Sequence, residues 1–229
     1  MYLSRASLKT SERGGTGALA TFLAGASGSI GQGHHLVWSL FGDRGGERHF
    51  LYRMTGATAA APILIASDEV PQDKHQLWDL EVKSLRLLDI MAAGDPIEWS
   101  IRVNATVRSK AGTTRETSAS HCIVDRALRQ GVTGTSMEVA AKVVPTWLAA
   151  RLAKAGLDAR AGDMVVQAYD KRRFGCRPGG RLPPVVIATT DVVGSGVVRD
   201  ADAVRNALRE GIGRARAYGC GLLLIRRSK

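Results

Sequence analysis

The chain has 229 residues, of which 45% are hydrophobic, so it is long enough for one large domain or two small ones with a buried core. Its formal net charge is +11. A surplus of this size predicts a polyanionic partner, and nucleic acid comes ahead of a membrane surface because phosphate neutralisation and counterion release drive binding. The alternative is a soluble protein that is basic overall.

The three cysteines, Cys122, Cys176 and Cys220, are too few and too far apart for a disulfide framework or a paired-cysteine zinc site. We therefore expect a reduced, cytoplasmic protein. Residues 18–26 have the composition of a signal-peptide core, but this stretch begins late and is too short to cross a bilayer. We expect no export and no membrane partner.

The first half of the chain alternates between strand and helix patterns. Residues 2–8 predict a strand, and residues 11–33, rich in Gly, Ala and Ser, have no firm period. From His34 a helical spacing places Leu36, Val37, Leu40 and Phe41 on one side, and Gly42 ends the run. Further strands are predicted at 49–54, 62–66, 77–85 and 97–108, the last by strict apolar and polar alternation.

The second half begins with a weakly patterned polar stretch, which predicts a loop from 109 to about 134. A helix is then expected from Pro145 to Gly156. The strands 164–169 and 184–198 flank a basic turn at 171–181, which predicts a hairpin with a charged tip. A last helix starts near Asp200 or Asp202, and a strand at 222–225 closes the chain.

Each half therefore has the element order of a βαββαβ unit. The sequence predicts an α+β protein made of two tandem ferredoxin-like, RRM-like domains. We expect an N-terminal domain at residues 1–108 and a C-terminal domain at residues 109–229.

A glycine-rich loop connects the last helix to the last strand. Residues 211–221 contain four glycines, Gly211, Gly213, Gly219 and Gly221, and two arginines. Glycine permits positive φ and close approach, and arginine suits phosphate, so this loop predicts an anion site. Its pattern matches neither a Walker loop nor a dinucleotide fingerprint, and a plain tight turn is the alternative.

Basic side chains on several elements could form one surface that follows an RNA backbone. At the hairpin, the alternative is a solvated tip. The candidate RNA-binding residues are Arg102, Arg108, Lys171, Arg172, Arg173, Arg177, Arg214 and Arg216.

None of the five histidines lies in a zinc-binding motif, so we expect no metal site and no cofactor. His34 stands at a predicted helix N-terminus, where the helix dipole disfavours the protonated imidazole and leaves a base near neutral pH. A packing role is the alternative. In RNA the 2′-hydroxyl can serve as the nucleophile, so a positioned base and nearby cations suffice for cleavage to a 2′,3′-cyclic phosphate and a 5′-hydroxyl.

Five segments in order resemble the CasE family, the repeat-RNA-processing endoribonucleases of type I-E CRISPR systems. They are Met1–Arg5, His34–Phe41, His49–Arg53, the strand around Arg102–Ala105, and Gly211–Leu223. The family's catalytic histidine stands four residues before the Trp and seven before the Phe of its helix. Trp38 and Phe41 follow His34 at these two spacings. The resemblance therefore implies that His34 is the catalytic histidine.

The resemblance implies metal-independent cleavage at the base of a CRISPR repeat RNA hairpin, and retention of the product with the other subunits of a type I-E surveillance complex. A non-catalytic double ferredoxin-like RNA-binding subunit and a basic ribosome-associated protein are the alternatives.

Overall fold

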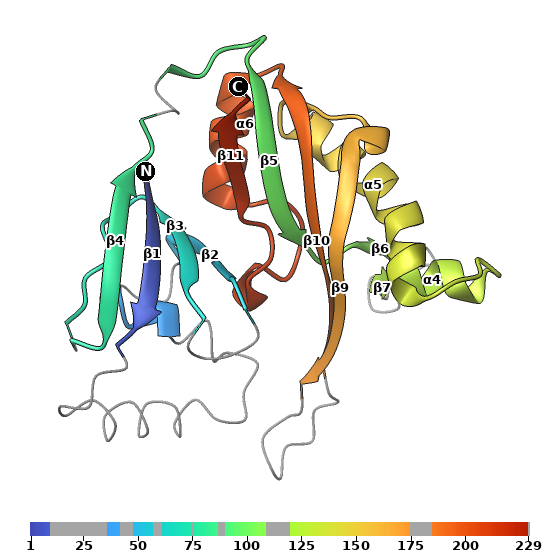
Figure 1. Ribbon diagram of the computed structural model, residues 1–229, viewed down its shortest axis with the longest axis horizontal. Helices are drawn as coiled ribbons and strands as arrows, with labels where there is room; N and C mark the ends of the chain where they lie inside the picture. The colour runs from blue at the N-terminus through green and yellow to red at the C-terminus, as the bar shows by residue number, and fades with distance from the viewer. Residues whose placement is uncertain are drawn as a thin grey trace, which may run out of the picture.

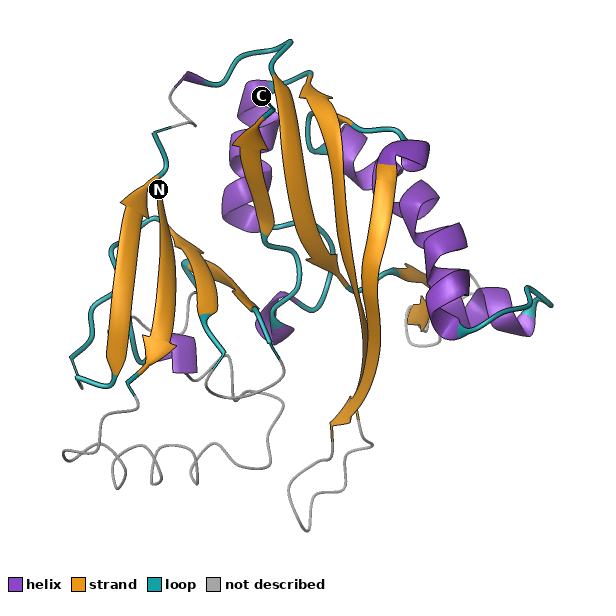
Figure 2. Ribbon diagram, viewed as in Figure 1, coloured by secondary structure: helices purple, strands orange, loops and turns teal. Residues whose placement is uncertain are grey.

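The computed structural model describes residues 1–9, 36–41, 48–56, 61–74, 76–86, 90–108, 120–174 and 185–228. Two antiparallel sheets lie beside each other, the first formed by the N-terminal part of the chain and the second by the C-terminal part (Figure 1). The long helices are grouped with the second sheet (Figure 2). No helix among the described residues is long and apolar enough to cross a membrane.

The first sheet contains β1 (Tyr2–Leu8), β2 (Phe50–Met54), β3 (Ile63–Ser67) and β4 (Trp78–Ser84) in the order β2-β3-β1-β4. All neighbouring strands are antiparallel. This is the strand order of a ferredoxin-like unit, with the first and third strands in the centre. Between β3 and β4, the described residues of 68–77 form no helix, so the unit lacks its usual second helix there.

A helical turn at residues 36–38 covers the apolar face of this sheet. Leu36 and Val37 are buried against it. The ring of Phe41 stacks on Phe50 at 5.0 Å, and Trp38 meets the same ring edge-on at 5.2 Å. The apolar side that the sequence predicted for this helix is therefore the side that packs, and it fixes the turn to β2.

The second sheet contains β5 (Pro96–Val103), β8 (Leu157–Asp158), β9 (Met164–Phe174), β10 (Val185–Val198) and β11 (Leu223–Arg227). β5 lies between β11 and β10, and β9 pairs with β10, which repeats the ferredoxin-like order. The short β8 extends the pairing at the end of β10. The predicted fold, two ferredoxin-like domains, is confirmed.

The pairing of β5 corrects the domain boundary expected after residue 108. β5 joins β10 and β11, so residues 96–103 belong to the second sheet. Alternation along the strand predicted a buried face but could not show which sheet it completes, because that depends on pairing with strands about 90 and 125 residues away. The two sheets divide between β4 and β5.

The strand predicted at 97–108 is in fact two strands. β5 ends at Val103, and β6 (Thr106–Arg108) pairs with β7 (Ser120–Cys122) in a separate small sheet. At the break, the Asn104 side-chain nitrogen donates to the Ala188 carbonyl at 2.7 Å, and the Ala105 carbonyl accepts from the Ile123 N–H at 3.0 Å. These bonds replace regular pairing and turn the chain out of the large sheet.

The expected loop and the expected helix start after it were wrong. α4 (Ile123–Arg129) lies within the predicted loop, and α5 (Ser136–Lys154) begins well before Pro145, which sits inside it. Thr135 and Glu138 form a reciprocal capping box that satisfies the first N–H groups of α5. The sequence signal for the start of α5 is therefore the capping box at Thr135 and Glu138, and Pro145 is tolerated inside the helix.

The main core lies between the second sheet and its helices. Trp99, Ile101 and Val103 of β5 pack with buried side chains of α5 and of α6 (Ala201–Glu210), which Asp200 caps as predicted. Two short 3-10 helices, η2 (Ala161–Asp163) and η3 (Arg216–Tyr218), precede β9 and β11. On the other face of β5, Ser100 and Arg102 contact Arg53 and Met54 of β2.

Candidate nucleic-acid interface

The glycine loop at 211–221 is a tightly folded joint rather than an open connector. Its four glycines all have positive φ, between 78° and 89°. The Gly221 N–H donates to the Arg102 carbonyl at 2.8 Å, and the Ile212 N–H donates to the Gly221 carbonyl at 2.9 Å. The loop is thereby attached to β5 and closed on itself.

The same loop packs against β2 of the first sheet. A side chain at Gly211 would place its Cβ 2.9 Å from a methyl group of Leu51. The Tyr52 hydroxyl donates to the Ala217 carbonyl at 2.7 Å, and burial raises the pKa of Tyr52 well above its usual range, so it remains a donor. Gly211 and Gly219 of the loop therefore lie against β2 and help to join the two ferredoxin-like units.

A basic corner lies at this joint. Arg216 is held by a bond from Nε to the Gly213 carbonyl at 3.2 Å. Arg48, just before β2, has a pKa lowered by burial and then by the charge of Arg216. Because the Arg216 charge disfavours the charged form of Arg48, an anion bound between the two guanidinium groups would offset this cost. Sequence reasoning selected Arg216 and missed Arg48, which only the pairing of β2 with the first sheet brings here.

A second basic site forms where the loop meets α5. A cavity of about 170 Å³ is lined by Thr106, Arg108, Trp147, Arg151, Gly213 and Arg214. The structure thus brings together the predicted RNA-binding residues Arg108 and Arg214. Arg151 completes the group and was not among the predicted RNA-binding residues.

Arg102, by contrast, is used within the protein. Its guanidinium makes two bonds of 2.7 Å to the Asp191 carboxylate and one of 3.0 Å to the Met54 carbonyl. Arg53 approaches the same carboxylate at 3.8 Å and donates to Ser100. This network connects the two sheets, and it leaves Arg102 out of the interface that we propose.

The predicted hairpin is formed by β9 and β10. Residues 185–189 of β10 pair only with β9, beyond the last partner of β5 at Thr190, so this end projects as a two-stranded ribbon (Figure 1). Lys171 binds Asp125 at 2.7 Å and Arg172 binds Asp170 at 2.5 Å. The side chain of Arg173 and the whole of Arg177 lie outside the described residues.

His34 also lies outside the described residues. The description resumes at Leu36, which is buried against β2. The predicted catalytic role of His34 therefore stays a prediction.

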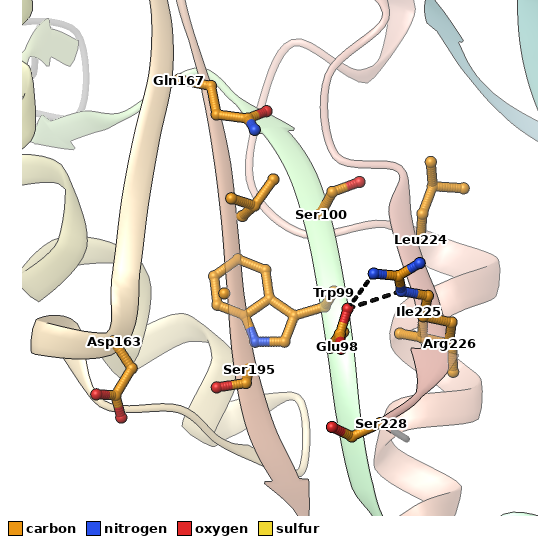
Figure 3. A pocket seen from close by; sticks show the side chains of 12 residues that line it. Glu98, Trp99, Ser100, Asp163, Gln167, Ser195, Leu224, Ile225, Arg226 and Ser228 are labelled. Atoms are coloured by element: carbon orange, nitrogen blue, oxygen red, sulfur yellow. Dashed lines mark hydrogen bonds and ion pairs between the residues drawn. The ribbon is translucent and has the colours of Figure 1, made fainter.

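A larger hollow of about 790 Å³ lies over the second sheet and has a mixed lining. Glu98 and Arg226 form an ion pair at its side, and Asp163 lies across from them (Figure 3). Its acids make it a poorer place for an RNA backbone than the arginine-lined cavity.

The fold has close counterparts among solved structures. The CRISPR endoribonuclease Cse3 bound to 19 nt RNA aligns with a TM-score of 0.69 and 16% identity, covering 99% of this chain and 100% of that one. Cas6e from Escherichia coli K-12 aligns at 0.57 and 18%, over 100% of both chains. A chain of a CRISPR RNA-guided surveillance complex aligns at 0.64 and 19%, again over 100% of both.

A comparison with curated protein sequences found no match. Residues 1–227 match the family described as CRISPR associated protein. That match covers both sheets, the glycine loop and the joint between them, and it agrees with the family that the sequence resembled. The chain belongs to the family of CRISPR associated proteins.

Proposed function

We propose that this protein is a metal-independent endoribonuclease that cleaves the stem-loops of CRISPR repeat RNA. The observation that carries the proposal is the basic corner of Arg48 and Arg216 on the glycine loop, at the joint of two ferredoxin-like units, in a chain of the CRISPR associated protein family. The likeness to RNA-bound Cse3 over the full chain supports RNA as the substrate.

His34 is the residue that we propose as the general base or acid. It stands two residues before Leu36 in the sequence, and Leu36 is buried. Leu36 packs in the same cluster as Phe50 and Tyr52, and the hydroxyl of Tyr52 reaches the glycine loop. The segment that follows His34 in the sequence thus packs beside β2, and β2 begins two residues after Arg48.

The proposed reaction uses the RNA's own 2′-hydroxyl. His34 removes the 2′ proton, the 2′ oxygen attacks the adjacent phosphorus, and the bond to the 5′ oxygen breaks. A general acid returns a proton to that oxygen, which gives a 2′,3′-cyclic phosphate and a 5′-hydroxyl. Arg48 and Arg216 would stabilise the negative charge that develops on the phosphate.

The β9–β10 ribbon is proposed to hold the stem. An A-form duplex displays little sequence in its narrow major groove and is recognised largely by shape and backbone charge. Lys171 and Arg172 are exposed on this ribbon, and Arg173 and Arg177 follow them in the sequence. Their ion pairs with Asp125 and Asp170 are exposed and would exchange readily for phosphates.

We further propose that the protein keeps its product and works beside other subunits. The support is the likeness to a chain of an RNA-guided surveillance complex, which covers the full length of both chains.

The decisive test is cleavage of a repeat hairpin in EDTA by wild type, His34→Ala and the matched control His49→Ala, whose side chain is exposed. We expect wild type and the control to cleave, and His34→Ala to bind without cleaving. Cleavage by His34→Ala, or a need for added metal, would refute the mechanism. A single 2′-deoxy nucleotide at the scissile position should abolish cleavage; if wild type binds but never cleaves, the protein is an RNA-binding subunit only.

A further inference from the structure

The cavity between the glycine loop, β6 and α5 is lined by several arginines around one tryptophan. General attraction of RNA to a basic surface does not require such a cavity. Among the described residues, its lining contains three arginines, Arg108, Arg151 and Arg214, together with Thr106, Trp147 and Gly213, and no acid. Elsewhere on the described surface arginines are commonly paired with carboxylates, as Arg199 is with Asp158. Like charges that line one small cavity repel, so this arrangement gains stability from an anion.

The tryptophan and Arg151 are fixed in place before any ligand arrives. The Trp147 indole N–H donates to the Thr106 carbonyl at 3.0 Å, which joins α5 to β6. The Arg151 guanidinium lies 3.5 Å above the indole ring and donates to the Trp147 carbonyl at 2.9 Å. A stacked guanidinium keeps its outer N–H groups for a ligand while losing little side-chain freedom on binding.

The glycine loop provides the opposite wall. A Cβ at Gly213 would be 3.7 Å from the Trp147 ring, so the loop backbone approaches the indole closely. Arg214 follows at once, and its backbone bridges to Asn104. The wall is thus attached to the chain just after β5 at Asn104, and it lies against Trp147 of α5.

Charge balance at Arg151 agrees with this geometry. Within the described part of the chain, neither Arg108 nor Arg151 has an ion-pair partner. Burial lowers the pKa of Arg151, which means that its charge lacks full compensation in the protein alone. A bound oxyanion would supply that compensation through charge-assisted hydrogen bonds.

We propose that this cavity binds one backbone phosphate of the repeat RNA, held by Arg108, Arg151 and Arg214. The phosphate is distinct from the scissile one that we assign to Arg48 and Arg216, because neither of these residues is among those that line the cavity, although Arg216 Nε reaches the Gly213 carbonyl beside it. Gly213 and Ala217 are four residues apart, at most about 14 Å along the chain. The bound phosphate therefore belongs to a nucleotide close to the cleavage site.

The inference rests on the proposed function, because the repeat RNA is the ligand, but its test reads binding alone. A hairpin made uncleavable by 2′-O-methyl nucleotides is titrated with wild type, Arg151→Gln and the control Lys154→Gln, which removes the same charge from an exposed position on the same helix. We expect about tenfold weaker binding for Arg151→Gln and less than twofold for the control. The slope of log K against log salt should fall by about 0.7 to 0.9 for Arg151→Gln.

The phosphate itself is located with a series of hairpins that each carry one neutral methylphosphonate linkage. At one linkage near the cleavage site, the methylphosphonate should weaken RNA binding by wild type about tenfold relative to the unmodified hairpin. The same methylphosphonate should not weaken binding by Arg151→Gln any further. Arg108→Gln, an exposed residue whose loss does not disturb the indole stacking, should couple to the same linkage. Melting temperatures of all variants are measured to show that each is folded.

Equal RNA affinity of Arg151→Gln and Lys154→Gln would overturn the proposal. It would also be overturned if, at every linkage, the affinity loss from the methylphosphonate simply added to the loss from Arg151→Gln. If wild type cleaves its RNA and this result is found, only the phosphate cavity is wrong. If His34→Ala cleaves like wild type but one linkage couples to Arg151, the catalytic mechanism is wrong and the cavity stands. Failure of wild type to bind the hairpin would refute both.

Discussion

The Tyr52 hydroxyl donates a hydrogen bond of 2.7 Å to the Ala217 carbonyl, between strand β2 of the first sheet and the glycine loop of the second. The two residues are 165 positions apart in the chain. This bond fixes the loop that carries Arg216 to the strand that packs on the turn after His34. The geometry of the proposed active site therefore depends on the contact between the two units.

Tyr52→Phe should lower the free energy of unfolding by about 1 to 2 kcal/mol, because the part-buried Ala217 carbonyl loses its donor. Urea unfolding measures this change. Tyr2→Phe is the control, since the Tyr2 hydroxyl makes no hydrogen bond within the described residues. A loss in the control equal to that in Tyr52→Phe would contradict the role of this bond.

Asp191→Asn should destabilise the protein by about 2 to 3 kcal/mol, because the side chains of Arg53 and Arg102 lose their shared carboxylate while only 14% and 22% exposed. Asp170→Asn, which removes a half-exposed partner of Arg172, should cost less than about 1 kcal/mol. Chemical unfolding compares the two. Similar costs would show that the network between the sheets is unimportant.

Arg216→Gln should reduce cleavage more than binding, since a cation beside the scissile phosphate acts mainly in the transition state. We expect the cleavage rate under saturating protein to fall about a hundredfold and affinity for the RNA to fall about tenfold. Single-turnover kinetics separates the two. Lys83→Gln, an exposed change on β4, should leave both near wild type. An unchanged rate in Arg216→Gln would exclude this arginine from catalysis.

Stability should fall with rising pH above about pH 9 because of Cys220. Burial raises the pKa of this thiol from 9.0 to about 12. Between these values the unfolded chain has lost the proton that the folded chain keeps, so the thiol's contribution is complete below pH 9 and is lost as pH rises. Cys220→Ala should reduce the slope by about 1.4 kcal/mol per pH unit in this range.

The measurement is urea unfolding of wild type and Cys220→Ala from pH 7 to pH 10.5. Between pH 7 and pH 8 the two slopes should agree, which serves as the internal control. Equal slopes above pH 9 as well would show that the buried thiol does not titrate as described.

Local patterns along the chain were enough to predict most elements of both units. The period of two at 97–103 and the capping aspartate before α6 depend on neighbouring residues only, and both were found. The start of α5 was missed although its signal, Thr135 followed by Glu138, was present in the sequence. Pro145 suits the first turn of a helix and therefore predicts a later start, but it lies inside α5.

The candidate site was only partly predictable. Arg214, Arg216 and the four glycines stand out because they are crowded into one short stretch. Arg48 and Arg151 are single basic residues in ordinary surroundings, and nothing local distinguishes them from the other arginines of a basic chain. Their proposed roles depend on neighbours that are far away in the sequence. Arg48 lies near Arg216, and Arg151 shares a cavity with Gly213 of the glycine loop.

By itself, the sequence determined the fold class, the basic character and the glycine loop, because hydrophobic periodicity, net charge and backbone permissiveness are properties of short segments. Tertiary structure alone decided which sheet β5 completes, that Arg102 is neutralised by Asp191, and which arginines share a cavity. The physical reason is that ion pairing, desolvation and shared cavities arise between residues that only the folded chain brings together.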